Sequence, residues 1–89
     1  MTRRKSWEVD VYVAEDDRET RARAVLRRAS REPVVGYGVA RRNPHDEQVP
    51  AIGEELACAR ALHELAERVL ELAAQDIEAV EGRPVVLAY

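Results

Sequence analysis

One cysteine, Cys58, and no phenylalanine occur among the 89 residues of this chain. A single cysteine cannot form an internal disulfide, so we expect a fold held together by packing, in a reducing compartment. No apolar run approaches the roughly 20 residues that a membrane-spanning helix needs. The Arg-rich residues 2–5 are followed by polar, alternating residues and not by the apolar core of a signal peptide. The sequence therefore predicts a cytoplasmic protein without a membrane anchor.

Motifs for catalysis, cofactors or metals are also lacking. His45 and Asp46 pair a histidine with a carboxylate, but they lie in a polar turn, where Asn43 and Asp46 side chains ordinarily stabilise the backbone. Cys58 and His63 are five residues apart, which puts them on different faces of a helix and outside the spacing of a zinc site. We therefore expect a protein that is not an enzyme and that has no cofactor and no metal.

Two glycines, Gly36 and Gly38, invite comparison with a phosphate-binding loop. A third glycine, a following Lys-Ser/Thr pair and an immediately following helix are all absent from this segment. Glycines at alternate positions lie on the same face of a strand, where they permit twist or the close approach of another backbone. The sequence leaves open whether that backbone belongs to this chain or to a partner.

The strongest positive signal is an amphipathic helix over residues 50–81. Apolar residues recur there at steps of three and four, and a second apolar row widens the stripe, which we expect to lie on a sheet. The main row consists of Ile52, Leu56, Ala59, Leu62, Ala66, Val69, Ala73, Ile77 and Val80, and the second of Cys58, Ala61, Leu65 and Leu72. Pro50 suits the first helical position, and Gly82 suits the left-handed residue that closes a helix.

The segments before the helix indicate a sheet. Residues 7–13 alternate apolar and polar side chains, as a strand with one buried face does, and residues 34–41 also read as a strand. Residues 19–28 fit two patterns, because their apolar residues alternate as in a strand while their alanines and arginines favour helix. Intrinsic propensity alone favours the helix for this segment.

The chain is organised as one domain. We expect a basic, flexible N-terminus at residues 1–5, a sheet over residues 6–41, a loop over residues 42–49, the helix and a tail over residues 82–89. Within the tail, residues 85–87 are apolar and allow a short terminal strand.

The length of the predicted helix indicates an interface. About 30 residues at 1.5 Å rise span roughly 45 Å, whereas a strand of eight residues spans only about 26 Å. The distal helix would then extend beyond its own sheet while still carrying apolar residues, and exposed apolar surface of that extent marks an interface. We expect a homodimer, with the interface at Val69, Leu72, Ala73, Ile77 and Val80.

A family resemblance covers almost the whole chain. It rests on the opening pattern Trp7-x-Val9-x-Val11, on the pattern that runs from Gly36-x-Gly38 through Asn43-Pro44-x-Asp46 and Val49-Pro50-x-Ile52-Gly53 to Arg60-Ala61-Leu62, and on Asp76-Ile77. These residues resemble a small actinobacterial family of domains of unknown function. The resemblance implies an α+β fold, a three-stranded antiparallel meander followed by one long helix (β-β-β-α), and therefore a strand at residues 19–28.

The same resemblance implies more than the strand order. Its fold is similar to the sheet-plus-helix part of the double-stranded-RNA-binding domain (dsRBD), some members resemble ribosome hibernation factors, and some pair by exchanging elements between subunits. It carries no catalytic or ligand-binding residue that could be transferred to this sequence.

Charge is distributed unevenly along the chain. Residues 1–45 carry 11 basic and 7 acidic residues, while residues 46–89 carry 3 and 10, within a total net charge of −3. Basic residues that could contact phosphates are Arg21, Arg23, Arg27, Arg41 and Arg42. Against this, Glu8 and Asp10 can pair with arginines across strands, the whole protein is acidic, and the stacking aromatics of single-strand binders are missing. The sequence therefore favours a solvated sheet face with cross-strand ion pairs over contact with nucleic acid.

Two hypotheses on function follow. The favoured one is a non-enzymatic, stress-associated or interaction protein that acts as a dimer and docks on another macromolecule, with the ribosome or RNA as the candidate partner. The alternative is a small-molecule-binding or catalytic module around the loop after the third strand, using Arg41, His45 and Asp46.

Overall fold

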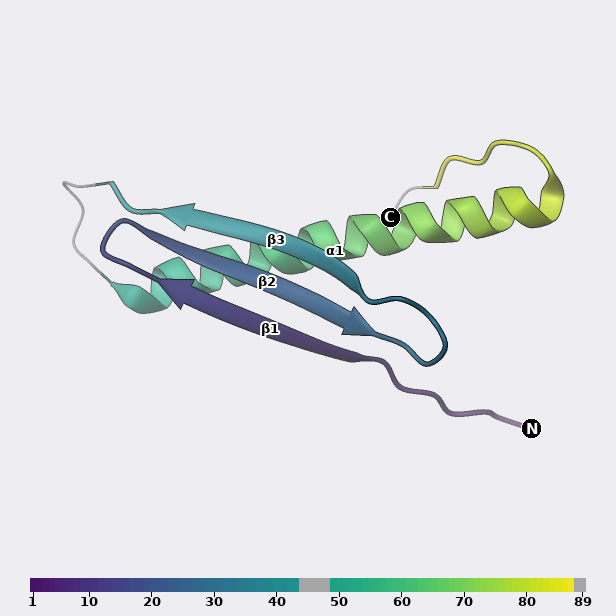
Figure 1. The fold of residues 1–89 in the computed structure, drawn as a ribbon, viewed down its shortest axis with the longest axis horizontal. Coiled ribbons are helices and arrows are strands. Elements are labelled where there is room, and N and C mark those ends of the chain that lie inside the picture. Colours follow the sequence, from purple (N-terminus) through teal and green to yellow (C-terminus); the bar gives the residue numbers. More distant parts are fainter. Residues whose placement is uncertain (44–48, 88–89) are drawn as a thin grey trace.

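A computed structural model describes residues 1–43 and 49–87 of the chain. Three strands, β1 (Glu8–Glu15), β2 (Glu19–Arg27) and β3 (Val34–Arg41), precede one helix, α1 (Pro50–Glu81) (Figure 1). The strands are antiparallel neighbours in the order β1-β2-β3. The predicted β-β-β-α fold is confirmed.

The disputed second segment is the central strand of this sheet. Ala22 lies between Val13 of β1 and Gly38 of β3, and every second residue of β2 faces α1. Helix propensity is worth only a few tenths of a kcal/mol per residue, whereas a central strand gains ladder hydrogen bonds on both sides. Tertiary pairing therefore overrides the local preference for helix.

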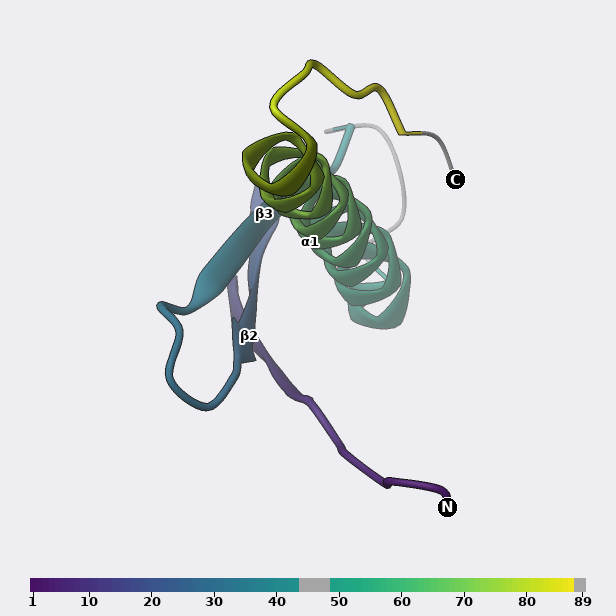
Figure 2. The ribbon, with the colours of Figure 1, turned by 90° about the vertical axis from the view of Figure 1, so that its right-hand side faces the viewer.

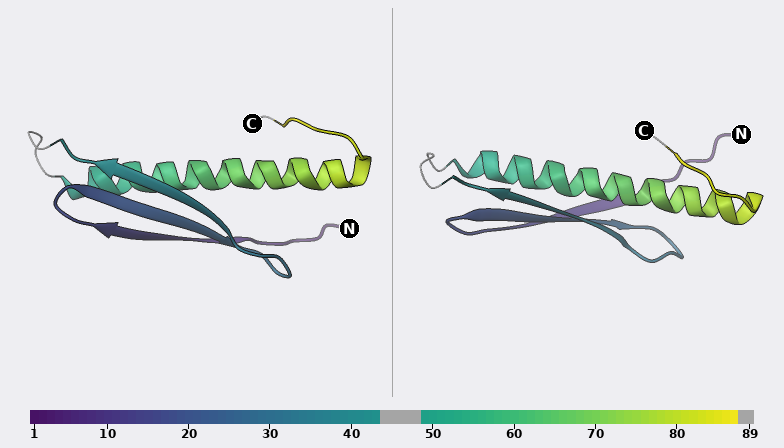
Figure 3. Two further views of the ribbon diagram at one scale, coloured as in Figure 1. Left: turned by 45° about the horizontal axis from the view of Figure 1, so that its top comes forward. Right: turned by 90° about the horizontal axis from the view of Figure 1, so that it is seen from above.

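The helix lies on one face of the sheet and leaves the other face open (Figures 2 and 3). Gly36 and Gly38 permit this contact, because a Cβ on Gly36 would overlap the backbone of Ala61 and Leu65. A Cβ on Gly38 would overlap the backbone of Ala57 and Ala61. The approaching backbone that the glycines require is thus that of the chain's own helix.

The helix buries the second of the two predicted apolar rows more than the main row. Ala57, Ala61 and Leu65 are the buried residues of α1, and Leu72 packs beside them. Ile52 and Leu62 of the main row are instead exposed. Gly36 and Gly38 allow the helix backbone to come close at Ala57 and Ala61, so that Leu65 reaches the core. Ile52 and Leu62 of the main row do not contact this core.

The core that results is small and rich in alanine. It consists of Ala22, Ala24, Leu26, Val34, Ala40, Ala57, Ala61 and Leu65. Because α1 packs mainly on β3 and β2 and hardly touches β1, the face of β1 on the helix side stays largely uncovered.

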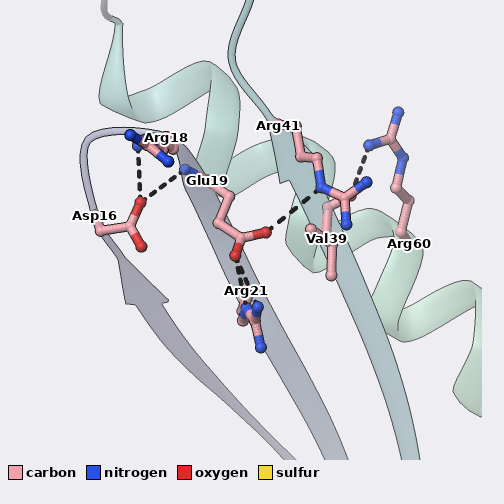
Figure 4. Close-up of polar contacts among 7 residues, drawn as sticks. All are labelled: Asp16, Arg18, Glu19, Arg21, Val39, Arg41 and Arg60. Atoms are coloured by element: carbon pink, nitrogen blue, oxygen red, sulfur yellow. Dashed lines mark hydrogen bonds and ion pairs between the residues drawn. The ribbon is translucent and has the colours of Figure 1, made fainter.

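The outer edge of β3 is closed by side chains of the helix. The carboxylate of Glu64 accepts a hydrogen bond of 3.1 Å from the backbone N–H of Tyr37. Arg60 donates a hydrogen bond of 2.7 Å to the carbonyl of Val39 (Figure 4). The Tyr37 N–H, followed by the neighbouring Arg68, lowers the pKa of Glu64 below its ordinary value. Such side chains satisfy an edge that could otherwise pair with another strand.

The distal half of α1 is held by two further contacts. Arg31, in the β2–β3 connection, forms an ion pair of 3.1 Å with Asp76. The helix closes at Gly82 (φ 73°), after which the chain turns back and the N–H of Val85 donates to Glu78. Residues 83–87 are irregular backbone and not a strand. The β2–β3 connection thus reaches farther along the helix than strand length alone predicts.

Candidate nucleic-acid interface

The face of the sheet opposite the helix carries most of the arginines that the sequence indicated. We call it the open face; its side chains belong to Glu8, Asp10, Tyr12, Ala14, Glu19, Arg21, Arg23, Val25, Arg27, Val35, Tyr37, Val39 and Arg41. These residues alternate with the helix-facing ones, so strand pairing puts them on one surface. No other element covers this surface within residues 1–43 and 49–87 (Figure 2).

An arginine between two tyrosines forms the central row of the open face. Register aligns Tyr12 of β1 with Arg23 of β2, and Arg23 with Tyr37 of β3. The Arg23 guanidinium lies 4.8 Å from the centroid of the Tyr12 ring, and Tyr37 is 57% exposed. A tyrosine ring and a stacked guanidinium are the two planar groups on which unpaired bases stack.

Acidic neighbours partly neutralise the flanking arginines. Arg27 forms an ion pair with Asp10 and donates a hydrogen bond of 3.2 Å to the hydroxyl of Tyr12. The Tyr12 hydroxyl, followed by Asp10, raises the pKa of Arg27. Arg21 pairs with Glu19 at 2.7 Å, which raises the pKa of Arg21 as well. The predicted cross-strand pairing of Asp10 is therefore confirmed, and the charge available to an anion is smaller than the number of arginines implies.

The remaining two predicted arginines end β3 and have different surroundings. Arg41 is exposed and lies 3.6 Å from Glu19 on the open face (Figure 4). Arg42 instead donates to the carbonyl of Asp17 at 3.1 Å and so ties the end of β3 to the β1–β2 turn. Four of the five predicted arginines share the open face, and Arg42 does not.

The β1–β2 turn that holds Arg42 is itself built by a carboxylate. Asp16 accepts hydrogen bonds from the N–H groups of Arg18 and Glu19 at 2.7 and 2.9 Å (Figure 4). These backbone donors lower the pKa of Asp16. The turn thereby fixes Glu19 where it contacts both Arg21 and Arg41.

Sequence reasoning missed the two tyrosines of the central row. Tyr12 and Tyr37 are 25 residues apart in the sequence, and neither stands in an aromatic-rich motif. Only the strand register shows that both flank Arg23. The sequence did offer one signal: each tyrosine alternates with the helix-facing residues of its strand, so both belong to the opposite face of the sheet.

Other candidate residues do not converge on a chemical site. Cys58 is half-buried against the core, while His63 is exposed and pairs with Glu67 at 2.6 Å. His45 and Asp46 lie outside the described residues. In the part of the chain that the structure describes, no three metal-binding side chains cluster together. The helix found there is not long and apolar enough to cross a membrane.

The predicted interface residues of the distal helix have mixed surroundings. Val69 and Leu72 pack against the core, Ala73 and Ile77 are half-buried, and Val80 is 87% exposed. Within the single chain, the exposed part of this set is therefore smaller than the sequence alone indicates.

This chain has relatives among known proteins. The chain belongs to the family described as Rv2632c-like, which matches residues 5–86. Two relatives are "Uncharacterized protein Mb1767" of Mycobacterium bovis and "Uncharacterized protein Rv2632c" of Mycobacterium tuberculosis. The first is 48% identical over 83 residues, covering 93% of this chain and 87% of the relative. The second is 48% identical over 81 residues, covering 91% and 86%.

A solved structure of the family has the same fold. The crystal structure of Rv2632c matches with a TM-score of 0.83 at 46% sequence identity, covering 93% of this chain and 98% of that chain. The names of these relatives state no catalytic activity.

Proposed function

We propose that this protein is a non-enzymatic interaction protein of the cytoplasm, that it acts as a homodimer, and that its open face docks on RNA, with the ribosome as the candidate partner. The observation that carries the proposal is the row Tyr12–Arg23–Tyr37. It combines stacking surfaces with a cation in the middle of an uncovered sheet. Single-stranded RNA is recognised in this way, by bases laid on aromatic side chains of a sheet.

Two further observations support an RNA ligand over a small anion. The central row lies on the broad side of a sheet three strands wide, which offers room for several nucleotides. The similarity to the dsRBD fold and to ribosome hibernation factors that the sequence resemblance implies is a further reason to propose RNA as the ligand and a role in stress. The acidic partners of Arg21 and Arg27 reduce the charge available to phosphates, so we expect modest affinity. Contacts between arginines and phosphates would make that affinity fall with salt.

Fluorescence anisotropy with labelled single-stranded RNA, and co-sedimentation with ribosomes, test the proposal. The variants R23Q and Y37A each remove one group of the central row. Since one stacked base contributes about 1–3 kcal/mol, we expect Y37A to weaken binding about tenfold or more. R23Q is expected to weaken binding to all sequences alike and to make it less dependent on salt.

The matched control is R83Q. It removes the same charge from the C-terminal tail, where Arg83 pairs with Glu81 and lies far from the strands in the sequence. It should leave RNA affinity within about twofold of the parent. The proposed function is overturned if neither RNA nor ribosomes show salt-sensitive binding near physiological ionic strength, or if R83Q is as damaging as R23Q.

A second candidate function rests on a hollow of about 320 Å³ beside the first turn of α1. The end of β3, the β1–β2 turn and the helix start surround it, and Thr20, Arg41, Ile52 and Leu56 are among its lining residues. The lining also contains four carboxylates and three arginines, so its charge does not select an anion. Its apolar residues suit a small organic molecule. Of Arg41, His45 and Asp46, which the sequence grouped here, only Arg41 lies within the described residues. Line broadening at Thr20 and Ile52 on addition of a fragment library would favour this candidate.

A further inference from the structure

The molecule has two uncovered apolar surfaces that complement each other. One is the helix-facing side of β1, which the chain's own helix leaves bare. The other is the main apolar row of α1, which lies on the flank of the helix toward β1 and is only partly covered. The inference drawn from them rests on the homodimer proposed above and specifies how it is built.

The bare side of β1 consists of three valines. Val9, Val11 and Val13 point to the same side of the sheet as the buried Ala22 and Ala24. They remain 44%, 36% and 42% exposed, because α1 lies over β3 and β2. Three strands form a surface about 10 Å across between the outer strand axes, and one helix is about 10 Å wide including its side chains. Since α1 sits toward one edge, the valines are left largely without a cover.

The main row of the helix is apolar over several turns. Leu62, Ala66, Val69, Ala73, Ile77 and Val80 follow one another at steps of three and four, with no charged residue among them. A helix that is apolar on two sides is normally buried on both. Here Ala57, Ala61 and Leu65 already contact the sheet, so the described part of the chain covers the main row only in part. Leu62, Ala66 and Val80 are exposed, while Val69 contacts the core.

The two surfaces lie on the same side of the molecule. Arg60 and Glu64 reach the edge of β3, so they mark the flank of α1 that faces away from β1. Leu62 and Ala66 follow two residues later, which is about 200° around the helix. They therefore lie on the flank toward β1, above the level of the valines.

We infer that a second copy of the chain fills this side, with the main row of each helix packed on the β1 valines of the other copy. The two helices then lie side by side in one layer between two sheets. Each helix contacts its own sheet through Ala57, Ala61 and Leu65 and contacts the partner through the main row. The contact is self-complementary, as a two-fold dimer requires, because each chain carries both the apolar helix row and the uncovered β1 valines on which that row packs.

Self-association fits these surfaces better than a foreign partner does. The β1 valines need a ridge of medium-sized apolar side chains without charge, and the chain itself carries such a ridge on a helix about 48 Å long. The open face stays outside the contact on both copies, so the dimer retains the RNA surface proposed above. The β3 edges are already closed by Arg60 and Glu64 and take no part.

Light scattering and charge complementation test the arrangement. The chain has a mass of 10.1 kDa, so the parent should give about twice that value. V11E places a negative charge on the β1 valines, and L62K places a positive charge on the main row. Each variant alone should be monomeric or only partly folded, with association weakened about a hundredfold or more. Mixed in equal amounts, they should form a heterodimer, in which one contact is unaltered and the other brings the two introduced charges together.

The matched control is A14E, which adds the same charge to β1 on the open face and should remain a dimer. A parent mass equal to that of one chain would overturn the homodimer itself and this arrangement with it. A dimeric parent whose V11E and L62K variants remain dimeric, or do not complement each other on mixing, would keep the homodimer but overturn this arrangement. A lysate protein that binds parent monomers through Val11 and Leu62 would also overturn it.

Discussion

At the scale of single residues, the fold depends on two glycines whose missing side chains admit the helix. The sequence showed that Gly36 and Gly38 share a strand face but not whose backbone approaches them. That information is tertiary, because it depends on where α1 packs relative to β3.

A comparison of two alanine substitutions tests the role of Gly38. G38A introduces a Cβ against the backbone of Ala57 and Ala61, which cannot move aside without shifting the helix. We expect it to lower the free energy of unfolding by about 1–3 kcal/mol or more. G53A meets only the Thr20 side chain and gains helix propensity, so its effect should be within about 1 kcal/mol. Urea denaturation measures both, and equal losses would contradict the close-approach argument.

The edge carboxylate Glu64 gives a prediction on pH. Its pKa is lowered in the folded protein, chiefly by the Tyr37 N–H, so its contribution to stability is fully present above the unfolded pKa. The contribution is lost as pH falls through the lower, folded pKa. E64Q should therefore be less stable than the parent at neutral pH, and the difference should narrow as the solution is acidified below about pH 4. Thermal unfolding at several pH values measures it; a difference that stays constant with pH would contradict it.

At the scale of elements, the helix was predictable and its orientation was not. The bounds of α1 follow from periodicity, Pro50 and Gly82, all of which are local signals. The sequence placed both apolar rows in one stripe toward the sheet and did not show which row is buried. The structure buries Ala57, Ala61 and Leu65 because two glycines opposite them set the distance between helix and sheet.

The same limit applies to β2 and to the candidate site. Alternation of Ala22 and Ala24 with arginines was visible in the sequence, but helix propensity competed with it, and only the family resemblance favoured the strand. The arginines of the open face could be predicted once β2 was taken as a strand. The tyrosine pair could not, because it depends on register across three strands.

Leu65 should be the main anchor of the helix on the sheet. It is the largest of the three buried helix residues, and few other large side chains fill this alanine-rich core. L65A should lower the free energy of unfolding by about 2–5 kcal/mol, by lost burial and by the cavity left behind. E71A, an exposed substitution on the same helix, should change it by less than about 0.5 kcal/mol. Denaturation midpoints at a constant protein concentration compare the two, and a small loss for L65A would place the anchor elsewhere.

At the scale of the whole molecule, the long helix would compensate for the small core, because it supplies apolar surface that a dimer can bury. Among residues 1–43 and 49–87, five of the nine buried apolar residues are alanine, so this part of the isolated chain buries little apolar surface for its length. The inferred dimer would add the β1 valines and the main row of α1 to a shared core. It would also direct the two open faces outward, so that one dimer could contact two segments of one RNA and gain affinity by multivalency.

Coupling between folding and association gives the last prediction. If the dimer supplies much of the stability, its unfolding midpoint must rise with protein concentration, because dilution favours separated chains. A tenfold increase in concentration changes the free energy by about 1.4 kcal/mol per dimer, which corresponds to about 3–6 °C for an assembly of this size. A14E should show the same dependence on concentration as the parent. V11E should unfold at a midpoint that is lower and independent of concentration, because the β1 valines no longer accept a partner's helix. Calorimetry over roughly a hundredfold range of concentration measures this, and a parent midpoint that does not move would mean that the alanine-rich core suffices on its own.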